Sequence, residues 1–459
     1  MEKRPLARGK LAFYLVILIA ASTASVIFLP RGLIRLAFAG IFILPAALLL
    51  FDRPRWILYI LLGLIFSCVY VFFDFPLVRL TSIFMAAAWA YMAVSERRVI
   101  VHDPVMAVLT TAFLLCAFQS MIFARDIASS LFRLDGFIKN LVYIFLIMQF
   151  CRTRGDLLRI FIAISAASMI SNFMPFFVPP PDNQSSLSLI WNEGIYRYEG
   201  YLREANMFAF SIIFLLPILL FLFARLKRPR FVRFLIAAAT AGTVFVLVLS
   251  FSRGGFVALA FMLLALLFVE RRNKAVVITG LAMVAVAAVM APAAYWSRIG
   301  SLAEIGNRMT EDTAILSRLY TMKIAVMLGL RNPLFGIGIE NFLFHVARFI
   351  PLPNVVHNSF LQVFSDLGFP GLIVFVWMLV YNLRVTLSLM RSREDHEKAL
   401  LGRILLVQQV AVIVNTLFLP VAYYIFTWFT MAIPTAVKYA YDNSENGSGG
   451  EVPKRHGSA

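Results

Sequence analysis

Three arginines and one histidine occupy positions where basic side chains could bind an anion. Arg203 lies in GYLREANMFAF, Arg253 in SFSRGGFVALA and His357 in PNVVHNSFLQVFSDLGFPG. A long apolar run follows each of them, so each is expected at the outer start of a helix whose unpaired N–H groups and dipole favour anions. Arg318, in ILSRLYTMKIAV, belongs to a segment that could fold over the other three. Because guanidinium groups bind phosphate in a bidentate manner, these residues predict a phosphate site.

Each of these residues also has an ordinary structural interpretation. An arginine near a membrane surface usually extends its charge into the water, and Arg318 could belong to the polar face of an amphipathic helix. A histidine at a helix start is often a solvated surface residue. The functional interpretation is favoured by the side of the membrane that the four residues share, and by the position of three of them at helix starts.

Other chemistry is poorly represented in the sequence. It contains no HExxH, no Cys/His ligand set, no Walker loop and no GxGxxG after a strand. The outer segments have no Asp-x-Asp, and their nearest acidic pair is Glu311-Asp312. We therefore expect no metal and no cofactor. Aromatic residues of the outer segments could stack on sugar rings or form an interfacial belt: Trp191, Tyr196, Tyr198, Tyr201 and Trp296.

The composition of the chain requires lipid as part of its solvent. Of 459 residues, 61% are hydrophobic and 14% charged, against about 45–50% and about 25% in soluble domains. These values exclude a single soluble domain, a disordered chain and a disulfide scaffold, and they predict an all-α polytopic protein of an inner membrane. The net charge of +18 is typical of basic loops that orient membrane helices, so we expect no nucleic-acid partner.

Fourteen apolar runs are candidate membrane spans, although several are short and the number could be twelve. They are residues 11–29, 33–51, 56–73, 77–94, 104–123, 137–150, 157–178, 205–223, 231–250, 254–269, 275–296, 358–382, 404–420 and 421–437. With the N-terminus inside, most Lys and Arg residues fall in cytoplasmic segments. Both termini are therefore expected in the cytoplasm.

The spans define the organisation of the chain. We expect a cytoplasmic N-terminus (1–10), transmembrane regions (11–178, 205–296 and 358–437), two periplasmic segments (179–204 and 297–357) and a disordered cytoplasmic tail (438–459). The longer periplasmic segment is predicted to hold an amphipathic helix with Ile315, Leu319, Met322 and Val326 on one face, which ends at the turn NPLFGIG. Long ordered segments on one face of a membrane protein often carry its function.

Three sequence patterns resemble the bacterial O-antigen ligase and polymerase superfamily, over roughly residues 195–380. They are SRGG at an outer helix start, SRLYTMKIAVMLGLRNPLFGIGIENF, and HNSFLQVFSDLGFPGLI. The resemblance implies a GT-C-like membrane glycosyltransferase that takes a glycan from undecaprenyl diphosphate at the periplasmic face, without a metal or nucleotide. By motif position it implies that His357 and Arg253 act in catalysis, and that Arg203, Arg253 and Arg318 bind the donor diphosphate.

The physical chemistry of the residues is compatible with this resemblance. A diphosphate leaving group gains negative charge as the anomeric C–O bond breaks, so fixed cations would stabilise the transition state more than the ground state. A neutral His357 could accept the proton of the acceptor hydroxyl.

Three functions stay open at the level of sequence. A ligase would use lipid A–core as the acceptor in lipopolysaccharide synthesis, whereas a polymerase would use a lipid-linked repeat. A transporter of lipid-linked glycan would be expected to have mid-span charges and internal repeats, which the sequence does not show.

Overall fold

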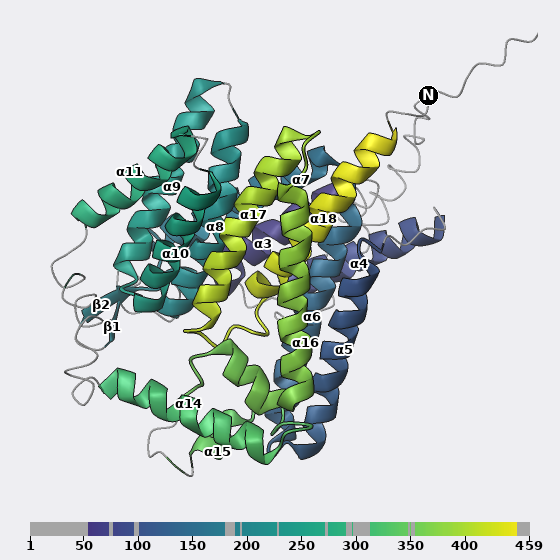
Figure 1. Cartoon of the computed structure of the whole chain (residues 1–459), viewed down its shortest axis with the longest axis vertical. Helices are drawn as coiled ribbons and strands as arrows, with labels where there is room; N and C mark the ends of the chain where they lie inside the picture. The colour runs from purple at the N-terminus through teal and green to yellow at the C-terminus, as the bar shows by residue number, and fades with distance from the viewer. Residues whose placement is uncertain are drawn as a thin grey trace, which may run out of the picture. The chain divides into compact units, whose positions relative to one another are not determined.

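The computed structural model describes residues 54–72, 77–95, 101–179, 189–192, 195–226, 229–270, 274–290, 296, 313–347, 349 and 354–447 (Figure 1). The predicted spans 11–29 and 33–51, the N-terminal segment 1–10 and residues 448–459 of the predicted tail lie outside the described residues. The chain divides into two units, residues 1–61 with 77–98 and residues 62–76 with 99–459. The first unit holds α4 (Leu77–Ser95) and residues 54–61 of α3 (Pro54–Ser67).

The second unit contains the remaining elements. They are η1 (Val69–Phe72), α5 (Pro104–Ser120), η2 (Met121–Phe123), α6 (Ile127–Phe150), α7 (Arg154–Phe173), η3 (Met174–Phe176), β1 (Leu189–Asn192), β2 (Ile195–Tyr198), η4 (Gly200–Leu202), α8 (Ala205–Arg225), α9 (Arg230–Leu249), α10 (Arg253–Val269), α11 (Lys274–Met290), α14 (Thr313–Arg331), α15 (Phe342–Val346), α16 (Ser359–Met390), α17 (His396–Thr416) and α18 (Ile425–Gly447). Within the described part of the chain, seven helices are long and apolar enough to cross a membrane. The predicted all-α polytopic membrane fold is confirmed.

The helices begin where the sequence supplies side chains that accept hydrogen bonds from their first N–H groups. Asp103 caps α5 ahead of Pro104, and Thr153 forms a reciprocal capping box with Asp156 at the start of α7. Asp126 caps α6, which therefore starts ten residues before the predicted span 137–150. At the other end of the chain, α18 continues to Gly447.

Two segments differ from the simple pattern of apolar runs. In residues 179–204, which we expected to be periplasmic, β1 and β2 pair as a short antiparallel hairpin in which Trp191 lies opposite Tyr196. In the core, α17 packs against α8, α10 and α16 (Figure 1). The side chain of Gln408 on α17 donates to the carbonyl of Phe214 on α8, which satisfies a polar group inside this apolar packing.

The predicted amphipathic helix exists as α14, but the face assigned to it is wrong. Leu319 and Val326 are exposed, whereas Thr321, Ile324, Ala325 and Leu328 are buried. The buried stripe faces α16, and a side chain at the neighbouring Gly329 would collide with the ring of Phe364. Small residues thus allow the close approach of the two helices, which hydrophobicity alone does not indicate.

A break in α16 connects it to the turn after α14. Gly368 has a φ of 71°, and Pro370 lacks the N–H that would bond to the carbonyl of Asp366 in a regular helix. That carbonyl instead accepts a hydrogen bond from Gly338 at 3.1 Å, and the carbonyl of Ser365 accepts one from Ile337 at 2.9 Å. The predicted turn NPLFGIG is therefore bonded directly to the broken helix.

A candidate active site at the helix ends

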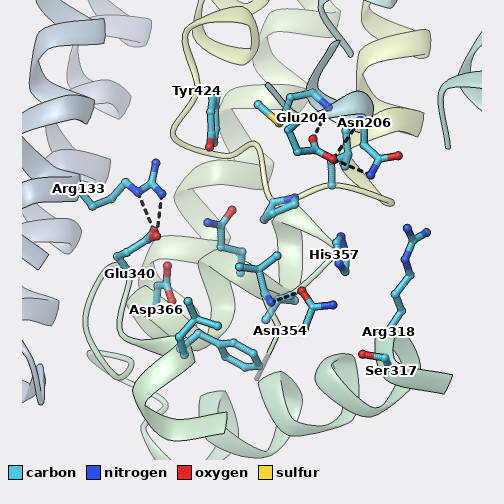
Figure 2. Close-up of a pocket in the computed structure, with 18 of the residues that line it drawn as sticks. Arg133, Glu204, Asn206, Ser317, Arg318, Glu340, Asn354, His357, Asp366 and Tyr424 are labelled. Carbon is cyan, nitrogen blue, oxygen red and sulfur yellow. Dashed lines mark hydrogen bonds and ion pairs between the residues drawn. The ribbon is translucent and has the colours of Figure 1, made fainter. Parts of the chain in front are cut away.

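The second unit encloses a cavity of about 660 Å³. Its walls come from α6, the end of β2, the start of α8, α14, residues 340–343, residues 354–357, the first part of α16 and the loop after α17. Figure 2 shows Arg318 and His357 on one side of this cavity, and Arg133, Glu340 and Asp366 on the other. Polar side chains from segments far apart in the sequence therefore converge on one space, as is typical of a ligand site.

The start of α8 forms one wall of the cavity. Both oxygens of Glu204 accept hydrogen bonds from the first N–H groups of the helix, at Asn206 and Met207. Arg197, which is only 4% exposed, donates to the carbonyl of Ser250 at 3.0 Å and to the Asn206 side chain at 2.9 Å. These bonds fix a buried guanidinium beside a helix N-terminus whose first N–H groups are already bound by the carboxylate of Glu204.

The start of α16 positions His357 in another part of the cavity wall. The side chain of Asn358 accepts a hydrogen bond from the Leu361 N–H, which makes it the N-cap of the helix. The hydroxyl of Ser359 donates to the carbonyl of Leu419 at 2.6 Å and accepts from the Val421 N–H at 2.9 Å. The helix start is thus tied to the loop after α17, and His357 directly precedes the cap.

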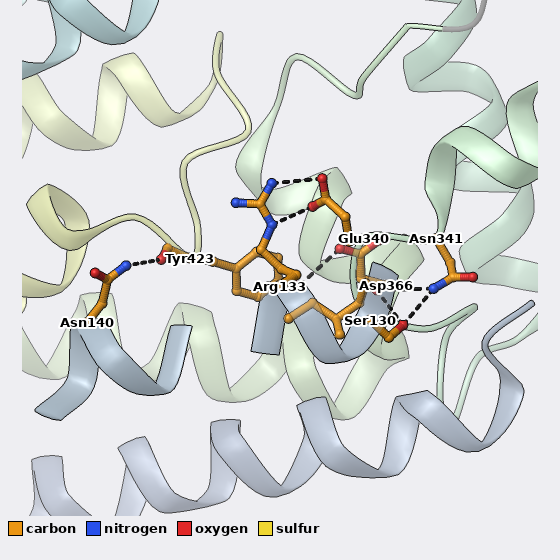
Figure 3. A network of polar contacts seen from close by, with 8 residues as sticks. Ser130, Arg133, Asn140, Glu340, Asn341, Asp366 and Tyr423 are labelled. Atoms are coloured by element: carbon orange, nitrogen blue, oxygen red, sulfur yellow. Dashed lines mark hydrogen bonds and ion pairs between the residues drawn. The ribbon is translucent and has the colours of Figure 1, made fainter. Parts of the chain in front are cut away.

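A bidentate ion pair forms the far side of the cavity. Arg133 donates from Nε and Nη2 to the two carboxylate oxygens of Glu340, at 2.6 and 2.7 Å (Figure 3). Glu340 has a φ of 62°, a left-handed conformation that is uncommon for a residue with a side chain. The neighbouring Asn341 donates to Ser130 and to the carbonyl of Asp126, which holds the strained segment against α6. Backbone strain maintained by such contacts is often found at functional sites.

Two acceptors on α16 also line the cavity. Asp366 is 1% exposed, and its Oδ2 accepts a hydrogen bond from the Tyr423 hydroxyl at 3.1 Å. Gln362, one turn earlier on the same face of the helix, is 8% exposed. Within the described residues, neither Asp366 Oδ1 nor Gln362 Oε1 has a hydrogen-bond partner.

The structure places the four predicted site residues in two groups. Arg318 and His357 line the cavity, whereas Arg203 and Arg253 lie outside its lining. Arg203 is exposed and has a left-handed φ of 58°. Arg253 is the first residue of α10 and follows Ser252, whose hydroxyl donates to the cavity residue Asn206 at 3.0 Å. The start of α10 is therefore hydrogen-bonded to a residue of the cavity wall, although Arg253 itself does not line the cavity.

The residues that sequence reasoning missed are Arg133, Arg197, Glu340, Gln362 and Asp366. Arg133 gave no local signal, because it stands in the mixed polar stretch ARDIASSLFRLDG before residue 137. The pairing of Arg133 with Glu340 joins residues that are 207 positions apart, so no local pattern reveals it. Among the residues that the structure describes, no group of three or more His, Cys, Asp and Glu side chains is arranged to hold a metal ion.

One comparison with known proteins bears on this site. Residues 238–376 match the family model described as O-antigen ligase. No curated protein matches the chain. The matched region runs from within α9 into α16, and it includes Arg253, Arg318, Glu340, His357 and Asp366. Over this region the chain is similar to the O-antigen ligase family, to which its sequence patterns also bear a resemblance.

Proposed function

We propose that the chain is an O-antigen ligase-like glycosyltransferase, which moves a glycan from undecaprenyl diphosphate to a sugar hydroxyl of lipid A–core or a related acceptor. The observation that carries the proposal is the cavity in which Arg318 and His357 lie with the first turns of α8 and α16. Guanidinium groups and helix N-termini both favour a phosphate group. The family match supports a membrane enzyme of this general type.

In the proposed reaction, the bond between the anomeric carbon and the diphosphate oxygen breaks, and a bond from the acceptor oxygen to that carbon forms. The electron pair of the broken bond stays on the diphosphate, where Arg318 and the helix dipoles stabilise the added charge. His357 accepts the proton of the acceptor hydroxyl. The diphosphate is already an activated leaving group, so the reaction needs no metal or nucleotide.

Arg203 and Arg253 keep their proposed roles on the basis of the resemblance. Arg253 would act in catalysis and both would bind the diphosphate at the edge of the cavity where α8 and α10 begin. Because Asn206 joins the starts of these two helices through Ser252, a diphosphate bound at α8 would lie near the α10 N-terminus as well.

The distribution of charge supports a periplasmic site. α8 begins at the cavity and ends at Arg225, which pairs with Glu397 at the start of α17. Arg154 at the start of α7 pairs with Asp395 in the same region. Since arginines collect on the cytoplasmic side of membrane proteins, the cavity would open toward the periplasm and α18 would end in the cytoplasm.

The proposal is tested by transfer from undecaprenyl-diphosphate-linked glycan in detergent, with purified full-length protein and no ion gradient. His357→Ala and Arg318→Ala should each lower the transfer rate by about 10²-fold or more. His345→Ala and Arg331→Ala are matched controls, because His345 on α15 and Arg331 at the end of α14 do not line the cavity. Equal rates in the site variants and their controls would refute the assigned roles.

The acceptor in the same assay separates the two related functions. Lipid A–core oligosaccharide as the productive acceptor would identify a ligase. A lipid-linked repeat as the productive acceptor would identify a polymerase, which could use the same donor site. A chain that moves lipid-linked glycan across vesicles without transferring it would be a transporter.

A further inference from the structure

The cavity has two ends with different chemistry. The basic end holds Arg318 and His357, and the opposite end holds Glu340, Asp366 and the ring of Tyr424 (Figure 2). Gln362 lines the cavity one turn before Asp366 on the same face of α16, and we group it with that opposite end. We name this opposite end the acceptor end. Its one cation, among the described lining residues on that side, is Arg133, whose guanidinium is occupied by the carboxylate of Glu340.

The acceptor end offers hydrogen-bond acceptors that the protein leaves unused. Asp366 Oδ1 and Gln362 Oε1 are buried, line the cavity and have no partner within the described residues. Buried acceptors without a partner are rare in folded proteins, so each calls for a ligand or an ordered water molecule. A carboxyl group can accept a hydrogen bond in either protonation state, and an amide oxygen always can.

These acceptors are held in place before any ligand binds. The carbonyl of Asp366 accepts from Gly338, and its Oδ2 accepts from the Tyr423 hydroxyl. Tyr423 is in turn fixed through its own carbonyl, which accepts from the Asn140 side chain at 3.1 Å. Figure 3 shows this network joining α6, the 340–341 segment and α16. Rigid, prepositioned acceptors favour a ligand with donors in a fixed arrangement.

We infer that the acceptor end binds hydroxyl groups of the sugar that receives the glycan. The inference rests on the proposed function, since it assigns the second substrate of the same site. A diphosphate has few or no protons to donate at neutral pH, so it cannot satisfy these unused acceptors. A pyranose has several hydroxyl donors, and its apolar C–H face can lie on an aromatic ring such as that of Tyr424. The donor diphosphate and the acceptor sugar thus occupy opposite ends of one cavity.

The test replaces one unused acceptor by an apolar side chain of similar size. Gln362→Met removes Oε1 with little change of volume, so the fold should be retained. Asn415→Leu is the matched control, because Asn415 is also a buried amide without a described partner, but it lies outside the cavity lining. Thermal unfolding of both variants in detergent reports on the fold independently of the site.

Binding is measured with two lipid-free probes, core oligosaccharide and a single repeat-unit oligosaccharide, by calorimetry on the detergent-solubilised full chain. We expect Gln362→Met to raise the Kd of the oligosaccharide that the wild-type protein binds by about tenfold, and Asn415→Leu to leave that Kd unchanged. The probe that binds distinguishes a core acceptor from a repeat-unit acceptor. In the transfer assay, Gln362→Met should raise the KM for the acceptor about tenfold and leave the KM for the lipid-linked donor unchanged.

The outcomes separate this inference from the proposed function. If the wild-type protein binds neither oligosaccharide, or if Gln362→Met binds as tightly as the wild type, the acceptor end holds only water and the inference is overturned. An equal rise of the donor KM would also overturn it. If the wild-type protein binds an oligosaccharide and transfers no glycan, the proposed function fails while the sugar site stands.

Discussion

The contact between the GIG turn and the broken helix α16 can be tested at a single glycine. Gly336 has a φ of 70°, and a Cβ atom built there would lie 2.3 Å from the backbone carbon and oxygen of Asp366. It would also lie 2.5 Å from the Leu367 backbone nitrogen. Backbone atoms cannot move aside as a flexible side chain can, so Gly336→Ala must displace either the turn or the cavity wall.

The expected cost has two parts. A left-handed conformation costs an alanine about 1–2 kcal/mol relative to glycine. The overlap with the Asp366 backbone adds about 1–3 kcal/mol, as is typical of overpacked cores. Gly336→Ala should therefore lower the free energy of unfolding by about 2–5 kcal/mol. Gly136→Ala within α6 is the control: no atom lies within 4 Å of its Cβ, so better helix propensity should raise the stability by about 0.5–1 kcal/mol.

Reversible unfolding by SDS in mixed micelles measures both variants, with helical circular dichroism as the readout. Gly336→Ala should unfold at a lower SDS fraction than the wild type, and Gly136→Ala at an equal or higher fraction. Because Asp366 lies in the cavity wall, Gly336→Ala should also lose glycan transfer under conditions where it stays folded. An unfolding midpoint at or above that of the wild type would show that the turn is not packed on Asp366 as described.

Two further predictions concern ionisable groups, Glu340 and His102. Glu340→Gln leaves the half-buried charge of Arg133 without its carboxylate. It should lower the free energy of unfolding by about 1–3 kcal/mol, a value reduced for solvent because each side chain of the pair is 28% exposed. In SDS unfolding, the double variant with Arg133→Gln should recover part of this loss, and additive losses would argue against coupling. Burial lowers the pKa of His102 from its ordinary value of 6.5, and this outweighs the hydrogen bond with the Cys151 carbonyl, which raises the pKa; the charge of Arg152 lowers it further. The ring lies at a tilt against that of Tyr439. Between these two pKa values the unfolded state binds more protons than the folded state. The contribution of His102 to the free energy of unfolding should therefore be complete above pH ~6.5 and decrease as the pH falls toward the lower pKa of the folded state. His102→Gln should flatten this dependence in thermal unfolding between about pH 7 and pH 5, and an unchanged slope would assign the dependence to other groups.

Hydropathy predicted much of the fold because the length and polarity of a membrane span are local properties. The predicted starts of α8, α9 and α10 lie within one residue of those in the structure. Capping residues reinforced these boundaries, as at Asn358 before α16. The same local signals indicated that His357 precedes an outward-facing helix start.

Where the prediction was wrong or incomplete, tertiary contacts decide the structure. The span 137–150 was predicted too short because α6 begins with polar residues such as Ser130 and Arg133, which hydropathy counts against a span. In the structure the buried Ser130 bonds to Ile339 and the half-buried Arg133 to Glu340, so both polar groups are satisfied. The buried face of α14 was misassigned for a related reason. The ring of Phe364 on the neighbouring α16 leaves room only for a glycine at residue 329, so the face that contains Gly329 packs against α16.

Arginine clusters are visible in a sequence, whereas the acidic groups that accompany them are not. Glu340 and Asp366 resemble any other acidic residues until the fold brings both to one cavity. Asp366 even stands in an apolar helix, where its burial would be costly without the Tyr423 hydroxyl. A sequence argument based on phosphate binding alone therefore finds the basic end of the cavity and omits the acceptor end.

The break in α16 explains how an apolar bundle can hold both ends of this cavity. In a regular helix through residues 366–370, the carbonyls of Ser365 and Asp366 would accept hydrogen bonds from N–H groups of the same helix, four residues later. Because Gly368 turns the chain and Pro370 has no N–H to give, those carbonyls are available to Ile337 and Gly338. In lipid such freed carbonyls need protein partners, and the partners lie just before Glu340. The interruption of one helix thus fixes Glu340 and Asp366 to each other, although 26 positions separate them in the chain.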